Sequence, residues 1–326
     1  MGKSKKKPDL NKQNENGLDQ FYTKPREAKR LFDLIGNHVN LDNYDLFVEP
    51  SSGGNSFGCL FPKGKSILMD IDPPEEIFLY NKDSDTFEKE NRKDSSANMV
   101  KIDFLSFGKC YESLGLKSDK KIISIGNPPF GKVSSLAVKF FNICAEFSDC
   151  ICFIIPRTFK RVSIQNRLNL NFHMVYNEDL PFSNSECVFE PAMNAKCCFQ
   201  IWERKETKRQ QIELSKSHPD WEFLPLGPLE ERAGCQNKQP TVPKGADFAM
   251  KAYGSNCGEI VTTKLENLRP KSWHWFKCDN PSELISKLKQ LDYSISKDSV
   301  RQSSLGKSDL VEIYTKKFGK GVDKNT

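Results

Sequence analysis

The sequence predicts an α/β fold, in which helices cover both faces of a largely parallel sheet, followed by a small basic α+β unit. Short apolar runs that end in acidic residues or turns predict the strands, and helical spacing in two other segments predicts the helices. The most distinct apolar runs are Leu46–Val48, Ser66–Met69, Met99–Ile102 and Ile122–Gly126. Buried strands that alternate with helical segments are typical of parallel sheets.

Two segments place apolar residues at helical spacing. Arg26–Ile35 does so through Ala28, Leu31, Phe32 and Ile35. Ser134–Phe147 does so through Leu136, Val138, Phe140, Phe141 and Ile143. We expect the second helix to pack behind the loop that follows the Ile122–Gly126 strand. Later strands are expected at Cys152–Ile155 and Cys197–Trp202.

Length and composition predict two folded units and an arm. The chain has 326 residues, of which 37% are hydrophobic, so it exceeds one typical domain and can bury a core. Residues 1–18 are polar and lysine-rich and predict a disordered basic arm. Residues 19–205 hold the strand pattern, with a charged surface insertion at Asn81–Asn98. Residues 206–326 form the α+β unit, with expected elements at Gly258–Thr262, Ser272–Lys277 and Pro281–Leu291.

Positive charge is concentrated late in the chain. Residues 1–203 contain 27 Lys and Arg and 27 Asp and Glu, whereas residues 204–326 contain 22 and 16. A positive excess suits contact with a phosphate backbone, although a solubilising surface has the same composition.

Several classes of protein are disfavoured. The eleven cysteines are scattered through apolar strands, which predicts reduced structural thiols rather than disulfides. The four histidines form no paired ligand spacing, so we expect no structural metal. Neither a membrane-spanning run of about 20 apolar residues nor an apolar signal core is present. We therefore expect no membrane contact and an intracellular location, cytoplasmic or nuclear.

The first strand leads into a loop suited to a nucleotide-type ligand. It ends in Glu49, and the turn that follows contains Gly53 and Gly54, which allow close approach of the backbone. A carboxylate at this point repels a pyrophosphate and suits a cationic ligand such as a sulfonium amino acid. We expect the turn to enter a helix.

Acidic residues also end the next two strands. Asp70 lies at about the separation where α/β nucleotide folds place a ribose-binding acid. Asp103 follows the third strand and precedes Phe104, whose ring would offer an apolar face to an adenine. Each acid alone also fits a solvated strand end or a helix cap. Their recurrence at three successive strands favours a converging crevice.

The fourth strand runs into Asn127, Pro128, Pro129 and Phe130. The two prolines fix two φ angles and lack N–H donors, so the loop cannot extend the strand and leaves carbonyls free to accept. Asn127 adds a side-chain acceptor, and Phe130 adds an aromatic face. Acceptors beside a stacking ring suit a planar base with an exocyclic amine, and the expected chemistry is alkylation of that amine. An ordinary Pro-Pro turn after a strand is the structural alternative.

Together these stretches resemble the S-adenosylmethionine-dependent amino-methyltransferases, and most of all the adenine-N6 enzymes. Phe21–Pro25 with Ala28 is similar to the family's N-terminal cofactor motif, and Glu49–Phe57 is similar to its glycine loop. The resemblance covers residues 19 to about 205 and implies a Rossmann-like class I methyltransferase fold. It also implies S-adenosyl-L-methionine as cofactor, bound at the C-terminal strand ends. The implied cofactor-binding residues are Tyr22, Thr23, Glu49, Ser51, Gly53, Asp70, Asp103 and Phe104.

The resemblance also assigns the target side of the site. Asn127 to Phe130 match the catalytic signature, in which Asn127 and the Pro128 carbonyl accept from the amine and Phe130 stacks on the base. Phe189 is the candidate for a second aromatic at an extruded base, although a core aromatic at a strand start fits equally well. Lys132 is a further candidate for substrate binding. The family usually has a second glycine where this chain has Asn55, a residue that tolerates left-handed φ.

Four functions fit these residues. Methylation of adenine N6 in DNA is favoured, because Glu49-Pro50 in the glycine loop resembles the DNA enzymes most. RNA adenine-N6 methylation follows closely, since ribosomal-RNA enzymes also carry Asn-Pro-Pro-Phe-Gly, as at Asn127–Gly131. Methylation of a protein glutamine fits less well, because those enzymes usually have tyrosine at the position of Phe130. An inactive, nucleic-acid-binding partner of another subunit is disfavoured by the intact Asn127, Asp70 and Asp103.

Overall fold

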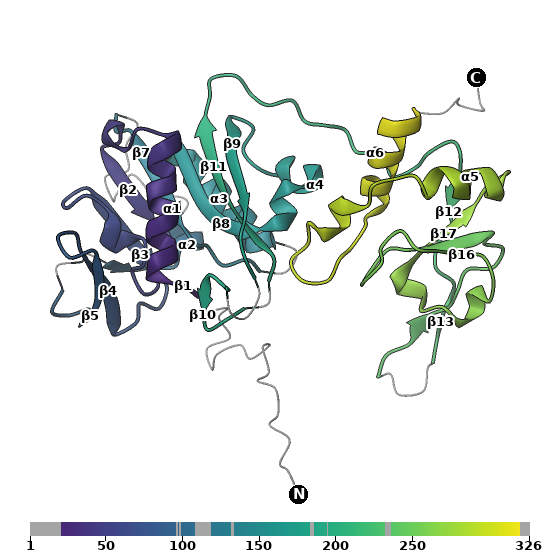
Figure 1. The fold of residues 1–326 in the computed structure, drawn as a ribbon, viewed down its shortest axis with the longest axis horizontal. Helices are drawn as coiled ribbons and strands as arrows, with labels where there is room; N and C mark the ends of the chain where they lie inside the picture. Colours follow the sequence, from purple (N-terminus) through teal and green to yellow (C-terminus); the bar gives the residue numbers. More distant parts are fainter. Residues whose placement is uncertain are drawn as a thin grey trace, which may run out of the picture. The chain divides into compact units, whose positions relative to one another are not determined.

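The computed structural model describes residues 21–95, 97, 99–107, 119–131, 134–182, 186–193, 195–231 and 236–319. The predicted arm at 1–18 and the candidate Lys132 lie outside the described residues. The chain divides into two compact units (Figure 1). Unit 1 runs to Phe159 and includes Ile164–Gln211, and unit 2 comprises Lys160–Ser163 and the residues from Ile212 onward.

A seven-stranded sheet forms the centre of unit 1, with the strand order β6-β3-β2-β7-β8-β11-β9. Its strands are β6 (Met99–Lys101), β3 (Ser66–Asp70), β2 (Leu46–Glu49), β7 (Ile122–Gly126), β8 (Cys150–Pro156), β11 (Cys197–Arg204) and β9 (Phe172–Asp179). The first five are mutually parallel, and β11 runs antiparallel to both β8 and β9. The predicted Rossmann-like, largely parallel sheet is therefore confirmed.

Helices cover both faces of this sheet, as predicted (Figure 1). The helix α1 (Pro25–His38) begins with a proline, and the N–H that proline lacks would have no partner within the helix at that position. The helix packs Phe32 against Phe47 of β2. Alternate residues of a strand point to opposite faces, so Leu46 and Val48 enter the core on the other face with α2 (Phe104–Phe107) and α3 (Ser135–Phe147).

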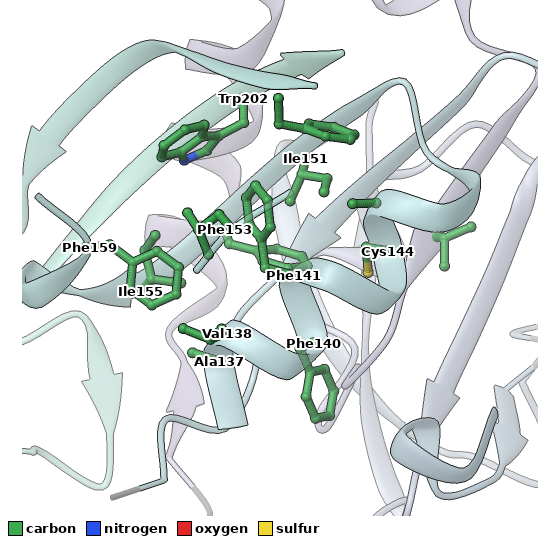
Figure 2. Packing of buried hydrophobic residues seen from close by; sticks show 14 of the residues in the cluster. Ala137, Val138, Phe140, Phe141, Cys144, Ile151, Phe153, Ile155, Phe159 and Trp202 are labelled. Atoms are coloured by element: carbon green, nitrogen blue, oxygen red, sulfur yellow. The ribbon is translucent and has the colours of Figure 1, made fainter. Parts of the chain in front are cut away.

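A hydrophobic core of unit 1 lies between α3 and the sheet. Figure 2 shows Val138, Phe141 and Cys144 of α3 gathered with side chains from β8. The ring of Phe141 meets that of Trp202 on β11 edge-on, with centroids 5.4 Å apart. Burial of these large apolar side chains is the main term that holds the helix on the sheet.

Smaller elements border the sheet edge. The two-residue strand β1 (Tyr22–Thr23) pairs with β10 (Phe189–Glu190), far along the chain. A hairpin of β4 (Glu76–Asn81) and β5 (Thr86–Asn91) follows β3. The charged segment expected as an insertion thus forms a hairpin that starts earlier than predicted, because Ile77 is buried within it.

Unit 2 is an antiparallel sheet with two longer helices. The sheet order is β12-β17-β15-β16, from Glu222–Phe223, Trp273–Lys277, Phe248–Lys251 and Ile260–Val261. The helices α5 (Pro281–Leu288) and α6 (Lys307–Phe318) pack their leucines and Tyr314 against it. A two-residue pair, β13 (Leu229–Glu230) and β14 (Gln239–Pro240), completes the unit.

Short helical segments complete the described chain: α4 (Val162–Gln165) and the 3-10 turns Leu41–Asn43, Gly58–Leu60, Arg157–Lys160, Leu265–Asn267, Pro270–Ser272 and Ser294–Lys297. Within the described residues, no helix has the length and apolarity needed to cross a bilayer.

Candidate functional site

The predicted site residues follow neighbouring parallel strands of unit 1. Asp103 follows β6, Asp70 ends β3, Glu49 ends β2 and Asn127 follows β7. Since these four strands are adjacent and parallel, their carboxyl ends meet at one edge of the sheet. The strand order reverses between β2 and β7, which is where ligands bind in open α/β sheets.

The loop after β2 is fastened to its neighbours by its own backbone and hydroxyls. The Ser51 hydroxyl donates to the Asn127 carbonyl at 3.1 Å, and the Ser52 N–H donates to the Met69 carbonyl at 2.8 Å. The Gly53 N–H donates to Oδ2 of Asp70 at 2.8 Å. The loop is therefore tied to β3 on one side and to the Asn-Pro-Pro-Phe loop on the other.

Tyr22 lies directly against Gly53. A Cβ at Gly53 would come within 2.7 Å of the Tyr22 ring, and the φ of Gly53 is +46°, so glycine alone fits both constraints. Partial burial raises the pKa of the Tyr22 phenol, and the nearby carboxylates of Asp70 and Asp72 raise it further. The structure thus brings together three predicted cofactor residues: Tyr22, Gly53 and Asp70.

Thr23 carries a buried hydroxyl with an open hydrogen-bonding capacity. Its backbone carbonyl accepts from the Ser56 hydroxyl at 2.6 Å, which ties β1 to the glycine loop. Its Oγ1, in contrast, is buried and finds no hydrogen-bond partner among the described residues. A buried hydroxyl without a partner is costly, so this atom suits contact with a ligand.

Asp70 organises the loop and keeps spare acceptor capacity. One carboxylate oxygen accepts from Gly53, and the other accepts from the N–H of Asp72 at 2.8 Å. A carboxylate has about four acceptor sites, so roughly two remain after these bonds. Asp70 can therefore support the loop and accept from a ligand hydroxyl at the same time.

Ile71 is a candidate ligand contact that the sequence pattern did not reveal. Its side chain is 48% exposed, although it follows a buried strand and lies between two acids. An exposed aliphatic side chain beside Asp70 offers the apolar surface that Phe104 was predicted to provide. The available signal in the sequence was Ile71 itself, an apolar residue that comes after the strand-end acid Asp70, where the apolar strand pattern has already ended.

The prediction for Phe104 is not supported by its surroundings. Its side chain is 2% exposed and packs in the core, with its ring 4.9 Å from that of Phe140 on α3. Asp103, just before it, accepts from the N–H of Leu105 at 3.0 Å and from the Ser106 hydroxyl at 2.7 Å. Asp103 therefore caps α2 while remaining exposed, and the cap turns Phe104 inward.

Glu49 is placed to hold the loop rather than to meet a ligand. It is 2% exposed, and its Oε2 accepts from the Gly58 N–H at 2.8 Å. Burial raises the pKa of Glu49 well above its usual value, although the Gly58 N–H opposes this change. The predicted helix after the loop is also wrong, because only the 3-10 turn Gly58–Leu60 forms there.

The amide of Asn127 has a fixed orientation. Its Nδ2 donates to the backbone carbonyl of Phe21 at 3.0 Å. A carbonyl can only accept, so the nitrogen must face Phe21, and Oδ1 is left as an acceptor on the other side of the amide. The backbone carbonyl of Asn127 is engaged by Ser51, so the side chain supplies the available acceptor.

The rings of Phe130 and Phe189 meet edge-on, with centroids 6.5 Å apart and planes at 74°. Phe189 is 1% exposed and pairs in register with Thr23, whereas Phe130 is partly exposed. Phe189 is therefore positioned to support Phe130 from behind, which favours the core alternative for that residue.

The loop ends in a tight junction with α3. The Phe130 carbonyl accepts from the N–H groups of Leu136 and Ala137 at 3.2 and 3.4 Å. Gly131 has a φ of +67°, and a Cβ there would lie 2.6 Å from Leu136. Pro128 is buried and Pro129 is partly exposed, and both prolines restrict the φ angles of the loop. Among the described residues, no three His, Cys, Asp or Glu side chains cluster as metal ligands.

No family model and no curated protein sequence matches this chain. Solved structures similar to it include a proposed RNA methyltransferase from Pyrococcus horikoshii, at 16% identity and a TM-score of 0.38, covering 59% of this chain and 91% of that one. A proposed methyltransferase from Escherichia coli has 13% identity and a TM-score of 0.31, covering 55% and 86%. A proposed class I S-adenosylmethionine-dependent methyltransferase from Listeria monocytogenes has 11% identity and a TM-score of 0.36, covering 59% and 63%. What the site does must therefore be inferred from its own geometry.

Proposed function

We propose that this protein transfers a methyl group from S-adenosyl-L-methionine to the exocyclic N6 amine of adenine in nucleic acid. The observation that carries the proposal is the amide of Asn127. Phe21 fixes its nitrogen, and the free Oδ1 belongs to the same loop as the partly exposed ring of Phe130. An oriented acceptor and a stacking ring on one rigid loop are what recognition of an aromatic amine requires.

The proposed chemistry relies on positioning. Asn127 Oδ1 and the Pro128 carbonyl accept the two hydrogens of the amine, which frees its lone pair for attack. Phe130 stacks on the base, with Phe189 behind it. The amine is neutral, so no general base is needed before attack on the methyl carbon. The methyl–sulfur bond would break as the nitrogen–carbon bond forms, with its electron pair left on the departing thioether, and the proton of the methylated amine leaves to water afterwards. Accepting groups that are already held in place avoid reorganisation during the reaction.

The residues around the glycine loop fit the proposed cofactor, which when bound supplies an electrophilic methyl group on a sulfonium. Tyr22 lies over Gly53, and the unpartnered Thr23 hydroxyl is buried next to it in β1. Asp70 retains acceptor capacity for ribose hydroxyls, and Ile71 offers apolar surface to the adenine. Asp72 is paired with Lys101 at 3.4 Å, and Asp70 and the exposed Asp103 add negative charge to this edge, which favours a cationic ligand over a polyphosphate.

The target base must leave its stack to reach Asn127. Extrusion costs a few kcal/mol from a duplex and less from a looped or single strand. DNA remains the first candidate and RNA the second, and neither is favoured by a specific contact in the described residues. The basic excess of residues 204–326 supports a role for the C-terminal part in holding the nucleic acid backbone. Lys132 stays a prediction for the same role.

A transfer assay tests this function. Methyl-labelled S-adenosylmethionine is incubated with single- and double-stranded DNA, with RNA and with a protein extract, and labelled nucleosides are identified after digestion. We expect N6-methylated adenine from one class of nucleic acid. Asn127→Ala should lower transfer at least about a hundredfold with little change in cofactor binding, because an acceptor used in the reaction is lost.

The matched control is Asn37→Ala, at an exposed position of α1, which should transfer at the wild-type rate. Label found only in protein would replace this proposal with glutamine methylation. More than about a tenth of wild-type turnover in Asn127→Ala would remove Asn127 from the reaction.

A further inference from the structure

The second half of the glycine loop, Gly54 and Asn55, is hydrogen-bonded to the β4–β5 hairpin. The Phe78 N–H donates to the Gly54 carbonyl at 2.9 Å, and Nδ2 of Asn55 donates to the Phe78 carbonyl, also at 2.9 Å. Gly54 lies against the Phe78 ring, since a Cβ at Gly54 would be 3.6 Å from that ring. The backbone of Phe78 thus donates its N–H to the loop and accepts from the loop with its carbonyl, as a residue does in a short antiparallel bridge.

Asn55 combines a left-handed backbone conformation, which a glycine could also adopt, with a buried side chain, which a glycine lacks. Its φ is +67°, in the left-handed region, and its side chain is 1% exposed. A glycine at this position would adopt the same φ at less cost, but it would have no side chain to reach Phe78. The residue that departs from the expected glycine pattern therefore adds a side-chain hydrogen bond to the backbone bond that joins Gly54 to the hairpin.

The base of the hairpin is pinned. The Arg92 N–H donates to the Glu75 carbonyl at 2.7 Å, and the Arg92 Nε donates to the Pro74 carbonyl at 3.0 Å. Pro73 and Pro74 restrict the chain between Asp72 and the first hairpin strand. The hairpin is consequently a firm support rather than a loose insertion.

We infer that Asn55 is a positioning residue that makes the β4–β5 hairpin part of the cofactor site, by fixing Gly54 and Asn55 through Phe78. Ser52 and Gly53 are fixed by β3, and Gly54 and Asn55 are fixed by the hairpin. Both halves of the loop must hold their positions for its backbone to meet a ligand. This inference rests on the proposed cofactor role of the loop. It makes cofactor affinity depend on the β4–β5 hairpin, which lies outside the sequence motifs of the candidate site.

The first test compares Asn55→Gly with the wild type by calorimetric titration of S-adenosylmethionine. If only the backbone conformation mattered, glycine would bind the cofactor as well or better. We expect affinity to fall about fivefold to tenfold, the effect of one lost hydrogen bond that orders the loop. Turnover at saturating cofactor should stay within about twofold of wild type, because Asn127 and Phe130 are unaffected.

The matched control is Asn256→Gly in unit 2, where another asparagine has a φ of +60°. This change has the same effect on the flexibility of the unfolded chain and should leave cofactor affinity unchanged. Amide hydrogen exchange provides a readout without cofactor: the Phe78 N–H should exchange faster in Asn55→Gly and not in Asn256→Gly.

The second test removes the hairpin. Because Glu75 and Arg92 are hydrogen-bonded, a short glycine-serine turn can replace residues 76–91. The shortened protein should bind the cofactor at least as weakly as Asn55→Gly, because it also loses the hydrogen bond from the Phe78 N–H to the Gly54 carbonyl. Adding Asn55→Gly to the shortened protein should produce no further loss. Circular dichroism checks that the shortened chain is folded, and Asn55→Gly alone remains decisive if it is not.

The outcomes separate this inference from the proposed function. No cofactor binding by the wild-type protein would overturn both. Cofactor binding that is equal in the wild type and Asn55→Gly would overturn this inference alone. A full additional loss on combining Asn55→Gly with the shortened hairpin would also overturn it, because Asn55 would then act without the hairpin.

Discussion

At the scale of single residues, the site is built by polar groups that each have two roles. Asp70 accepts from two backbone N–H groups and still has acceptor sites free. Asn127 donates to Phe21 and by doing so directs its oxygen away from it. If such a residue also faces a ligand, as we propose for Asp70 and Asn127, its substitution should act on stability and on binding together.

Asp70→Ala illustrates this double effect. We expect cofactor affinity to fall about tenfold or more, because an acceptor for ribose hydroxyls is lost. The structure adds a fall in melting temperature, because the N–H groups of Gly53 and Asp72 lose their partner. Calorimetry and thermal unfolding measure the two effects. The control Asp83→Ala, at an exposed position of the hairpin, should change neither the affinity nor the melting temperature. An unaltered cofactor affinity in Asp70→Ala would show that the ribose does not bind at Asp70.

Glu49 should make stability depend on pH. Its pKa is raised by burial in the folded state, so its contribution is fully present below the unfolded value of about 4.3 and is lost as the pH rises through the folded pKa. Glu49→Gln stays neutral and can still accept from Gly58. The melting temperature of the variant should therefore exceed that of the wild type by an amount that grows with pH.

Thermal unfolding between about pH 4 and 9 measures this difference, with the exposed Glu88→Gln as control. A constant difference across this range would mean that Glu49 is charged in the fold.

At the scale of elements, the predictable parts were those with strong apolar patterns. The strands β2, β3, β7 and β8 were expected within a residue or two at most ends. The side chains of β2, β7 and β8 are buried on both faces, and β3 is an apolar run with a buried centre. The edge strand β9 and the helix α6 were not foreseen. In β9 the adjacent apolar residues Met174 and Val175 are both exposed, so the strand has no alternating pattern, and in α6 the buried face includes the charged Asp309. The pairing of β1 with β10 was beyond prediction, because two-residue strands have no periodicity.

The site residues divide in the same way. The positions of Asp70 at a strand end, of Asn127 just after one and of Gly53 in a turn could be predicted, because strand ends and turns are visible in a sequence. Their roles toward a ligand stay predictions. Phe104 could not, because an aromatic residue after a strand-end acid fits a ligand contact and a core position equally. Only the packing of α2 on α3 decides between them.

Gly53→Ala tests the contact between the glycine loop and β1. The added methyl group would lie 2.7 Å from the Tyr22 ring, so the loop or the ring must move, and we expect cofactor binding to fall at least about tenfold. Gly64→Ala is the matched control, because Gly64 also has positive φ, at +74°, but its Cβ would meet nothing. Melting temperatures of both variants isolate the contact from the backbone strain.

A double variant tests whether the contact with the Tyr22 ring causes the loss in Gly53→Ala. In a Tyr22→Ala background, Gly53→Ala should lose stability only by the amount seen for Gly64→Ala. A larger loss there would show that the φ of Gly53, and not Tyr22, sets the cost.

At the scale of the whole molecule, the C-terminal part is the basic one. If it holds nucleic acid, reversing the charges of Lys264, Arg269 and Lys271 should weaken binding across sequences. The slope of log affinity against log salt should become shallower by about one unit per lost phosphate contact. Salt titrations with fluorescent single- and double-stranded DNA and RNA measure this slope.

The control reverses Lys63, Lys82 and Lys93 in unit 1, which changes the net charge equally. Cofactor affinity should be the same in the wild type and the C-terminal variant. If the slopes of the wild type and that variant coincide, the basic excess is a solvated surface and unit 1 holds the substrate alone.

The pairing of β1 with β10 determines when the site can form. Tyr22 faces Glu190 in this pair, and Asn127 is held by Phe21, so the loop with Asn127 depends on residues from near the start of the described chain and from beyond residue 188. Contacts so distant in sequence require closure of a long loop before they stabilise anything, which makes them slow to form. During synthesis, the β1–β10 pair that holds Tyr22 therefore cannot form until residue 190 has been added to the chain.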